Sequence, residues 1–267
     1  MTELRIITPS APLHSGPTTD ASLDNEGLFG ETFKVTGTKN GFVFGSLIAD
    51  GYEGWIPKNC LGDLPVPNAR LIAPMTHVTL RESVKSPSCF SLSFRAAVNV
   101  INTKGDRAKI ATATGHAFLP RRHIQPLADV KKKPSAENEL VDIDWVGFAE
   151  RLINAPYKWG GRTAWGLDCS ALVQLSLAAA GLDVPRDSGP QHEIGAHLDI
   201  ESRLSKSHLR RGDLVFWQGH VGIMQDHHRL LHANAYHMAV VSEPLEDAVT
   251  RISPIAGPIT ALRRPLF

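Results

Sequence analysis

The sequence lacks both a framework of disulfide bonds and a long apolar segment. Its 267 residues include three cysteines with no C-x-x-C pair, so neither a disulfide scaffold nor a thiolate zinc site is expected. No uncharged apolar run is long enough to predict a transmembrane helix. The net charge of +1 gives no bulk electrostatic reason to expect binding to nucleic acid or to a membrane.

The N-terminal residues also lack the basic stretch followed by an apolar stretch that is typical of an export signal. We therefore expect a cytoplasmic protein, whereas a signal removed by processing would make it periplasmic or secreted. The odd number of widely spaced cysteines suits a reducing compartment, in which a reactive thiol survives. Cys60 and Cys89 lie in strand-like segments, and we expect both to be packing residues.

The first 128 residues are predicted to be rich in β-strands, because short apolar runs alternate with glycine, proline, asparagine and aspartate. The segments Tyr52–Leu61 and Gly115–Ile124 resemble one another, and a repeat of about sixty residues is long enough to form a small β-barrel. The pattern resembles tandem bacterial SH3 domains, with Gly-Trp-Ile-Pro around Trp55 as its strongest element. We predict one domain at 1–65 and a divergent second at 66–128. The predicted strands are Phe33–Val35, Phe42–Leu47, Gly54–Pro57, Val98–Ile101 and Ala108–Ala113.

Residues 129–138 are polar and charged and contain a proline, which predicts a linker. Residues 139–267 combine helical and strand-like patterns, with a first helix predicted at Val141–Asn154. A second, amphipathic helix is predicted to begin at Cys169 and to end at Gly181. Strand-like runs follow at Asp213–Trp217, Val221–Gln225, Leu230–Ala233 and Met238–Val241. A helix that carries a thiol beside an antiparallel sheet that carries histidines is a papain-like α+β layout.

The position of Cys169 points to a nucleophile. The residue follows a segment rich in glycine and tryptophan and comes directly after Asp168, a suitable N-cap. The positive end of the helix dipole and a nearby imidazole would lower the pKa of its thiol toward neutrality. An isolated cysteine is more often a buried structural residue, but this local context favours catalysis.

A thiol nucleophile needs a base within hydrogen-bonding distance and a group that orients the base. His220 is the predicted base, because it begins the second strand of a hairpin that turns at Gln218-Gly219. His232 is the predicted orienting residue, because it could bond the far nitrogen of the His220 ring and fix its tautomer. His237 is an alternative for that role. A zinc site formed by the three histidines is a further alternative, but their spacing matches no zinc motif, and we expect no cofactor.

Six motifs occur in the order that is typical of the NlpC family of cell-wall cysteine peptidases: Tyr157-x-Trp-Gly-Gly, Asp168-Cys-Ser170, Pro185-Arg-Asp-Ser188, Gly212-Asp-Leu-Val-Phe, His220-Val-Gly-Ile and His232. The similarity covers about residues 139–267. It implies a papain-like enzyme that cuts peptidoglycan peptides, with Cys169 as nucleophile, His220 as base and His232 as orienting residue.

The same resemblance assigns residues around the nucleophile. The backbone N–H of Cys169 would stabilise the oxyanion, and Tyr157 would add a second donor. Asp168 and Ser170 would line the cleft, although capping the helix is an equally good role for Asp168.

Family members with SH3 domains include enzymes that hydrolyse the γ-D-glutamyl to L-diamino-acid bond of freed stem peptides and require a free N-terminal L-alanine. The resemblance therefore implies peptidoglycan-derived peptides as substrates, with diaminopimelate or lysine as the diamino acid, and a role in cell-wall peptide recycling. Tyr52 matches an aromatic residue at the substrate amine, and Asp187 matches an acid there, beside Ser188. Glu31 would be a second acid. Arg186 would bind a substrate carboxylate or pair with Asp187.

Two other functions fit parts of the sequence. A cell-wall amidase or an acyltransferase on the same thiol fold would use the cysteine and histidines without needing Tyr52 or Asp187. A non-catalytic wall-binding protein would use the SH3 domains alone, and would not need the three catalytic residues. We expect a monomer that binds neither nucleic acid nor membranes.

Overall fold

The computed structural model describes residues 2–127, 144–201 and 208–266. The chain divides into an N-terminal unit, Met1–Glu139 with Gly160–Ala164, and a C-terminal unit, Leu140–Trp159 with Trp165–Phe267. The linker predicted at 129–138 lies outside the described residues.

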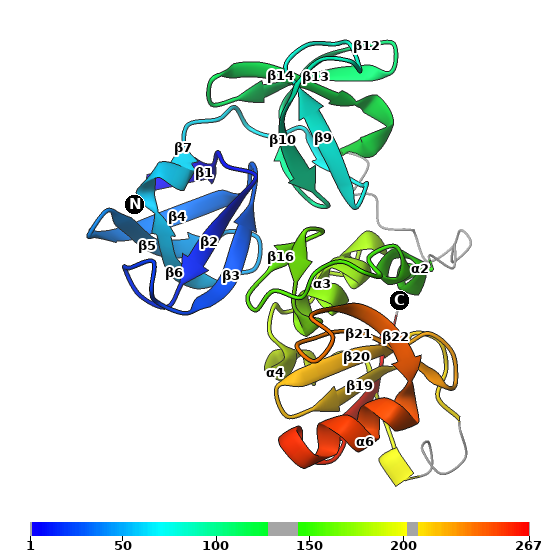
Figure 1. Cartoon of the computed structure of the whole chain (residues 1–267). Helices are drawn as coiled ribbons and strands as arrows, with labels where there is room; N and C mark the ends of the chain where they lie inside the picture. Colours follow the sequence, from blue (N-terminus) through cyan, green and yellow to red (C-terminus); the bar gives the residue numbers. More distant parts are fainter. Residues whose placement is uncertain (1, 128–143, 202–207, 267) are drawn as a thin grey trace. The chain divides into compact units, whose positions relative to one another are not determined.

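The first barrel of the N-terminal unit is one antiparallel sheet with the strand order β3-β2-β6-β5-β4-β1-β7 (Figure 1). Its strands are β1 (Thr2–Ile6), β2 (Ser10–His14), β3 (Leu23–Leu28), β4 (Thr32–Lys39), β5 (Phe42–Leu47), β6 (Glu53–Pro57) and β7 (Leu61–Gly62). Buried and partly exposed residues alternate along β5, which is the period of a strand with one face in the core. The strands predicted at Phe33–Val35, Phe42–Leu47 and Gly54–Pro57 are confirmed.

The second barrel has two sheets, ordered β10-β9-β14-β13-β12 and β11-β8-β15. Its strands are β8 (Ala69–Leu71), β9 (Met75–Thr79), β10 (Ser88–Ser93), β11 (Ala97–Val98), β12 (Val100–Lys104), β13 (Arg107–Thr112), β14 (Gly115–Pro120) and β15 (Ile124–Pro126). The strand predicted at Val98–Ile101 is divided between β11 and β12, because Asn99 interrupts it.

The predicted sequence repeat has a structural counterpart in the two barrels. In each, a strand ends at a proline, Pro57 or Pro120, which caps a single 3-10 turn. These turns are η1 (Lys58–Cys60) and η2 (Arg121–His123), and a short strand, β7 or β15, follows each of them.

The two cysteines outside the predicted active site differ in their surroundings. Cys60 is buried in the core of the first barrel, as predicted for a packing residue. Cys89 is exposed on β10, where the pairing with β9 shifts register between Ser88 and Phe90. The prediction that Cys89 is a packing residue is wrong, because this bulge turns its side chain away from the core. All three cysteines are free thiols.

The C-terminal unit is built on an antiparallel six-stranded sheet with the order β18-β23-β19-β20-β21-β22. These strands are β18 (Ala196–Leu198), β19 (Leu214–Trp217), β20 (His220–Met224), β21 (Arg229–Asn234), β22 (Ala239–Pro244) and β23 (Ala261–Arg264). The helices are α2 (Trp145–Glu150), α3 (Cys169–Ala179), α4 (Ser188–Gln191) and α6 (Leu245–Ala256). The short strand β17 (Gly166–Leu167) precedes α3, whereas β16 (Arg162–Thr163) belongs to the segment of the N-terminal unit. Helix α3 packs against β20 and β21, and α6 packs against β21 and β22 (Figure 1).

Helix α3 begins and ends where the sequence predicts. Asp168 is its N-cap, and Gly181 follows its end with a positive φ of 83°. The amides of Gly181 and Leu182 donate to the carbonyls of Ala178 and Leu177, which is a Schellman arrangement. The prediction that this helix is amphipathic is wrong, because every residue from Cys169 to Leu177 is buried.

Two other predictions for this unit need revision. The helix predicted at Val141–Asn154 is shorter, because α2 ends at Glu150 and residues 151–154 form turns; residues 141–143 lie outside the described part. Helix α6 was not predicted. Its residues Leu245, Ala248 and Ile252 join the core formed with β19, β20, β21 and β23.

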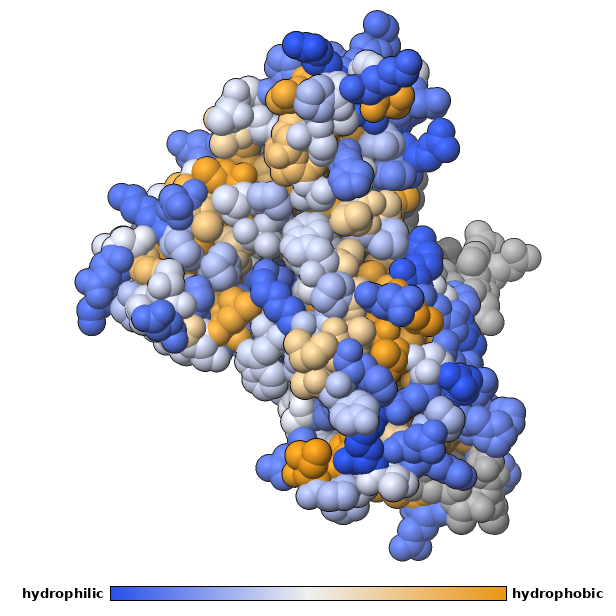
Figure 2. All heavy atoms as spheres, in the orientation of Figure 1, coloured by the Kyte–Doolittle hydropathy of each residue, from blue (hydrophilic) through white to orange (hydrophobic). Residues whose placement is uncertain are grey.

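The surface is mixed in character. On the face shown in Figure 2, hydrophilic side chains predominate and apolar ones occur in small groups between them. Among the described residues, no helix has both the length and the apolar character needed to cross a membrane.

Candidate active site

The predicted nucleophile lies in the first turn of α3, held by a buried network of polar side chains. The carboxylate of Asp168 accepts the amide hydrogen of Ala171 at 2.9 Å, which caps the helix. Arg186 donates to both oxygens of Asp168, at 2.9 and 2.7 Å, and to Ser170 Oγ at 2.9 Å. This network fixes the backbone on both sides of Cys169.

The network changes the interpretation of three predicted site residues. Asp168, Ser170 and Arg186 are 7%, 6% and 3% exposed, so they are buried around the nucleophile, and their predicted contacts with substrate stay predictions. Asp168 is the helix cap, the alternative role foreseen for it. The guanidinium of Arg186 is directed at Asp168 and Ser170, and its predicted contact with a substrate carboxylate or with Asp187 stays a prediction.

The two predicted histidines contact one another on neighbouring strands. The register pairs Trp217 with His220, so Gln218-Gly219 is the two-residue turn of the β19–β20 hairpin, as predicted. His220 Nε2 lies 2.8 Å from His232 Nδ1 on β21. His237 instead bonds Asn234 Oδ1 through both its amide and its ring Nδ1. The structure therefore favours His232 over His237 as the orienting residue.

The sulfur of Cys169 lies at the start of β20. It accepts hydrogen bonds from the backbone amides of Val221 and Ser170, and Val221 directly follows His220. The start of α3 therefore lies against the beginning of β20, the strand that His220 begins.

The protonation states differ from those predicted. Burial, with a further contribution from Asp168, raises the pKa of the Cys169 thiol to about 12, against the opposing effect of the two amides and Arg186. Burial and the nearby His232 lower the pKa of His220 below its ordinary value. The prediction of a lowered thiol pKa is wrong for the free enzyme, because burial outweighs the helix dipole.

A neutral thiol beside a neutral imidazole is a pair that is ready for proton transfer. The imidazole can accept the proton as the sulfur attacks a carbonyl carbon, which is general-base catalysis. The imidazolium and the oxyanion that forms on the substrate would then stabilise one another in a site with little water.

The role of Tyr157 as an oxyanion donor stays a prediction. Burial raises its pKa to about 12, and the nearby Cys169 and Asp168 add to the effect. Its phenol therefore stays protonated at neutral pH and can donate a hydrogen bond. The amide of Cys169, in the first turn of α3, is a second donor that helix bonding does not use.

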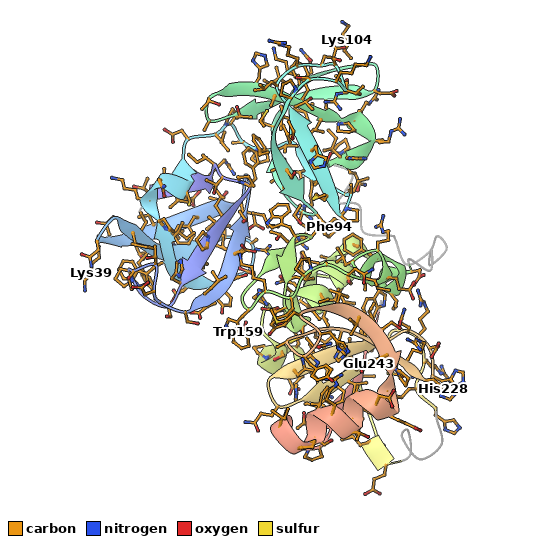
Figure 3. The ribbon with its side chains drawn as sticks, viewed as in Figure 1. Lys39, Phe94, Lys104, Trp159, His228 and Glu243 are labelled. Carbon is orange, nitrogen blue, oxygen red and sulfur yellow. The ribbon has the colours of Figure 1, made fainter. Side chains whose placement is uncertain are left out.

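A second layer of residues, which the sequence analysis missed, surrounds His232. Glu243 on β22, labelled in Figure 3, places Oε1 2.6 Å from His232 Nε2. Arg251 on α6 bonds the same carboxylate and lies 4.6 Å from the ring centre of Tyr236. Asn234 Nδ2 lies 3.0 Å from His232 Nε2. No local pattern indicates Glu243, because its partner is reached only when β21 and β22 pair.

Two predicted substrate-binding residues begin α4. Asp187 is its N-cap residue, with no capping bond from its side chain, and is exposed; Ser188 is half-buried. Ser188 also lines a pocket of about 300 Å³ that reaches the β19–β20 turn. The other lining residues are Gly189, His192, Trp217, Gln218, Gly219 and Thr260. A larger hollow of about 640 Å³ on the second barrel is lined by charged residues and contains none of the predicted catalytic groups.

The remaining predicted residues belong to the N-terminal unit. Tyr52 is half-buried against the core of the first barrel, and its hydroxyl lies 3.5 Å from the carbonyl of Asp24. Glu31 accepts two hydrogen bonds from Arg162, at 2.7 and 3.1 Å, and one from the amide of Leu28 at 2.8 Å. This buried ion pair gives Glu31 a structural role in place of the predicted contact with a substrate amine.

The alternative of a zinc site finds no support in the arrangement of side chains. Across residues 2–127, 144–201 and 208–266, no three His, Cys, Asp or Glu side chains are grouped so that they could hold a metal ion.

A thiol at the start of a buried helix, beside an antiparallel sheet with paired histidines, defines a papain-like cysteine peptidase. Comparison with known proteins identifies two of its domains. Residues 154–252 match the NlpC/P60 family, and residues 13–61 match the bacterial dipeptidyl-peptidase SH3 domain. The chain therefore contains an NlpC/P60 cysteine peptidase domain, preceded by a bacterial dipeptidyl-peptidase SH3 domain.

Individual relatives agree with this assignment. A gamma-D-glutamyl-L-lysine dipeptidyl-peptidase of Bacillus subtilis is 25% identical over 80% of this chain and 70% of that protein. A protein of the same name from Bacillus cereus is 30% identical over 43% of this chain and only 32% of its own length. The crystal structure of an NlpC/P60 family protein from Bacillus cereus covers 100% of both chains, with a TM-score of 0.79 at 19% identity, which shows a shared fold.

Proposed function

We propose that this protein hydrolyses the γ-D-glutamyl to L-diamino-acid bond of peptidoglycan stem peptides that carry a free N-terminal L-alanine. The observation that carries the proposal is the packing of α3, which begins with Cys169, against the strands of the His220–His232 pair, in a chain that also has a dipeptidyl-peptidase SH3 domain. The names of the two Bacillus relatives support this choice of bond.

The proposed reaction follows the geometry of the site. The sulfur of Cys169 attacks the γ-carbonyl carbon of D-glutamate while His220 accepts the thiol proton. The amide of Cys169 and the phenol of Tyr157 donate hydrogen bonds to the developing oxyanion. His220 then returns the proton to the amine of the departing diamino acid, and water hydrolyses the thioester to release L-Ala-γ-D-Glu.

Recognition of the free amine is assigned to the exposed end of α4. We propose that Asp187 pairs with the N-terminal ammonium and that Ser188 contributes a hydrogen bond beside it. The pocket next to Ser188 has the volume of a small-molecule site, which suits part of a short peptide. The role predicted for Tyr52 stays a prediction.

A free L-alanine amine arises only once a stem peptide has left the glycan strand. We therefore propose that the enzyme acts in cell-wall peptide recycling, in the cytoplasm. Peptidase activity in the cytoplasmic fraction of cells that produce the protein would support this placement, and activity confined to the wall fraction would contradict it.

The test is a comparison of peptides by mass spectrometry. The enzyme is incubated with L-Ala-γ-D-Glu-L-Lys, with the diaminopimelate form, and with the N-acetylated form of each. We expect release of L-Ala-γ-D-Glu from the free peptides, at least about 100-fold slower cleavage of the acetylated ones, and no products with Cys169→Ala.

The same experiment examines the main alternative. An amidase or acyltransferase on this fold would not need the free amine. Equal turnover of acetylated and free peptides, or intact tripeptides after long incubation, would therefore contradict the proposed function.

A further inference from the structure

The residues behind His232 form a chain of contacts that ends at a charged pair. His220 Nε2 lies 2.8 Å from His232 Nδ1, and His232 Nε2 lies 2.6 Å from Glu243 Oε1. Arg251 bonds the same carboxylate from α6. Each link joins a different element, since β20, β21, β22 and α6 contribute one residue each.

The two rings can carry their protons in only two consistent ways. A neutral imidazole has one N–H and one lone pair, so the state of each ring nitrogen depends on its partner. If His232 Nε2 carries the proton, its Nδ1 accepts from His220 Nε2, and His220 Nδ1 has a free lone pair. If His232 Nδ1 carries the proton, His220 Nδ1 is protonated and cannot act as a base.

Glu243 decides between these states because an ionised carboxylate can only accept hydrogen bonds. Burial acts to raise its pKa, but His232, Arg251 and His237 outweigh burial, so the pKa of Glu243 is lowered and the group stays ionised. An unprotonated His232 Nε2 would direct its lone pair at this carboxylate from 2.6 Å, which is repulsive. The carboxylate therefore requires a hydrogen on Nε2.

Asn234 is the group that competes with Glu243. Its oxygen accepts the amide hydrogen of His237 at 2.9 Å, which leaves its NH₂ group 3.0 Å from His232 Nε2. A bond from this NH₂ would require the lone pair on Nε2 and so the inactive state. The charged contact at 2.6 Å is both shorter and stronger than the neutral one at 3.0 Å, so Glu243 prevails.

We propose that Glu243, held by Arg251, is a positioning residue that sets the tautomers of His232 and His220 so that the Nδ1 atom of His220 is the base. This inference rests on the catalytic roles proposed above for Cys169, His220 and His232. Arg251 holds the carboxylate in place, and the ring of Tyr236 packs on the guanidinium.

The test combines a spectroscopic signature with kinetics. Nitrogen NMR of the histidine-labelled protein, with the His220 and His232 signals assigned from single variants, should show a proton on Nε2 of both rings. In Glu243→Ala we expect His232 to shift toward the Nδ1–H form. A proton on Nδ1 of His232 in the unaltered protein would overturn the proposal.

Kinetics of the same variant separate positioning from substrate binding. Because a positioned base contributes about 10²- to 10⁴-fold, partial loss of orientation should lower kcat about 10- to 100-fold with little change in KM. Alkylation of Cys169, followed by peptide mapping, should slow by at least about tenfold. Glu246→Ala, which removes an exposed carboxylate three residues away, is the matched control and should leave all three readouts unchanged.

The outcomes distinguish this inference from the proposed function. The NMR and alkylation measurements need no substrate, so they hold even if the tripeptides are not cleaved. If Glu243→Ala does not fold, the same measurements are made on Glu243→Gln. The tautomers of the unaltered protein, read by NMR, then test the proposal without any variant. A Glu243→Ala protein that is folded, with unchanged kcat and unchanged alkylation, would refute the role of Glu243.

Discussion

Arg162 and Arg186 are two buried arginines that make the same kind of contact in different parts of the molecule. Each guanidinium forms two hydrogen bonds with one carboxylate, that of Glu31 in the N-terminal unit and that of Asp168 in the C-terminal unit. The arginine side chains are 2% and 1% exposed, so both pairs are shielded from water.

The two pairs differ in what the carboxylate holds. Asp168 caps the helix that begins with the nucleophile, so Arg186 supports the geometry of the active site itself. Arg162 also donates its backbone amide to Glu26 at 2.9 Å, so this cluster attaches the segment Gly160–Ala164 to the first barrel. A buried arginine–carboxylate ion pair therefore supports the active site in the C-terminal unit, and holds a chain segment on the first barrel in the N-terminal unit.

The largest effect is expected from Arg186→Met. This change removes the buried charged partner of Asp168, and breaking a buried ion pair typically costs about 3–5 kcal/mol of stability. Hydrogen exchange in α3 should increase, and kcat of the folded protein should fall at least about tenfold, since the first turn of the helix loosens. Arg210→Met, at an exposed position, is the control and should change neither hydrogen exchange in α3 nor kcat. A folded variant with normal kcat would show that the cap does not support the nucleophile.

Arg162→Met should cost about as much stability, because the Glu31 carboxylate and the backbone carbonyl of Glu26 lose the buried guanidinium. The two arginine variants are expected to differ in where hydrogen exchange increases and in kcat. Hydrogen exchange should increase in β3 and β4, exchange in α3 should stay as in the unaltered protein, and kcat should stay within about threefold. Increased exchange in α3 equal to that of Arg186→Met would remove the distinction between the two pairs.

The conservative amides Asp168→Asn and Glu31→Gln should have intermediate effects. Each keeps an acceptor oxygen but removes the charge, which we expect to cost about 1–3 kcal/mol. Because asparagine is as good an N-cap as aspartate, Asp168→Asn should keep α3 protected from exchange and lose less kcat than Arg186→Met. An equal loss of kcat in both variants would mean that the charge, and not the cap, is what the site requires.

The smallest effect is expected at an exposed arginine. Arg211 bonds Asp144 and Glu150, but the three side chains are 38%, 58% and 32% exposed. Arg211→Ala should cost at most about 1 kcal/mol at pH 7. Arg211 lowers the pKa of both carboxylates, so the stabilisation is present above their ordinary pKa and is lost as the pH falls. Denaturation curves of Arg211→Ala and the unaltered protein should converge as the pH falls below about 4. A stability difference that persists there would contradict the expected direction of the pH dependence.

Local signals in the sequence were sufficient for much of the fold. The Gln218-Gly219 turn, the capping of α3 and the repeated strand–proline–turn segments each depend on neighbours within a few residues, and each is confirmed. Cys89 shows the limit of this reasoning, because a bulge in strand pairing decides which face a residue occupies.

Contacts between distant residues could not be predicted. The partners Arg162 and Glu31 are 131 positions apart, and no periodicity connects them. Glu243 meets His232 only after β22 has paired with β21. The raised pKa of Cys169 comes from burial of its thiol, whereas the sequence indicated only that the thiol begins a helix.

The most direct measurement is covalent labelling with an electrophilic ketone that carries an L-Ala-γ-D-Glu group, followed by peptide mapping. We predict that the label adds to Cys169 alone, that His220→Ala reacts far more slowly, and that an N-acetylated probe reacts poorly with the unaltered enzyme. Labelling at Cys60 or Cys89 instead, or equal labelling of the unaltered and His220→Ala proteins, would contradict the assignment of nucleophile and base.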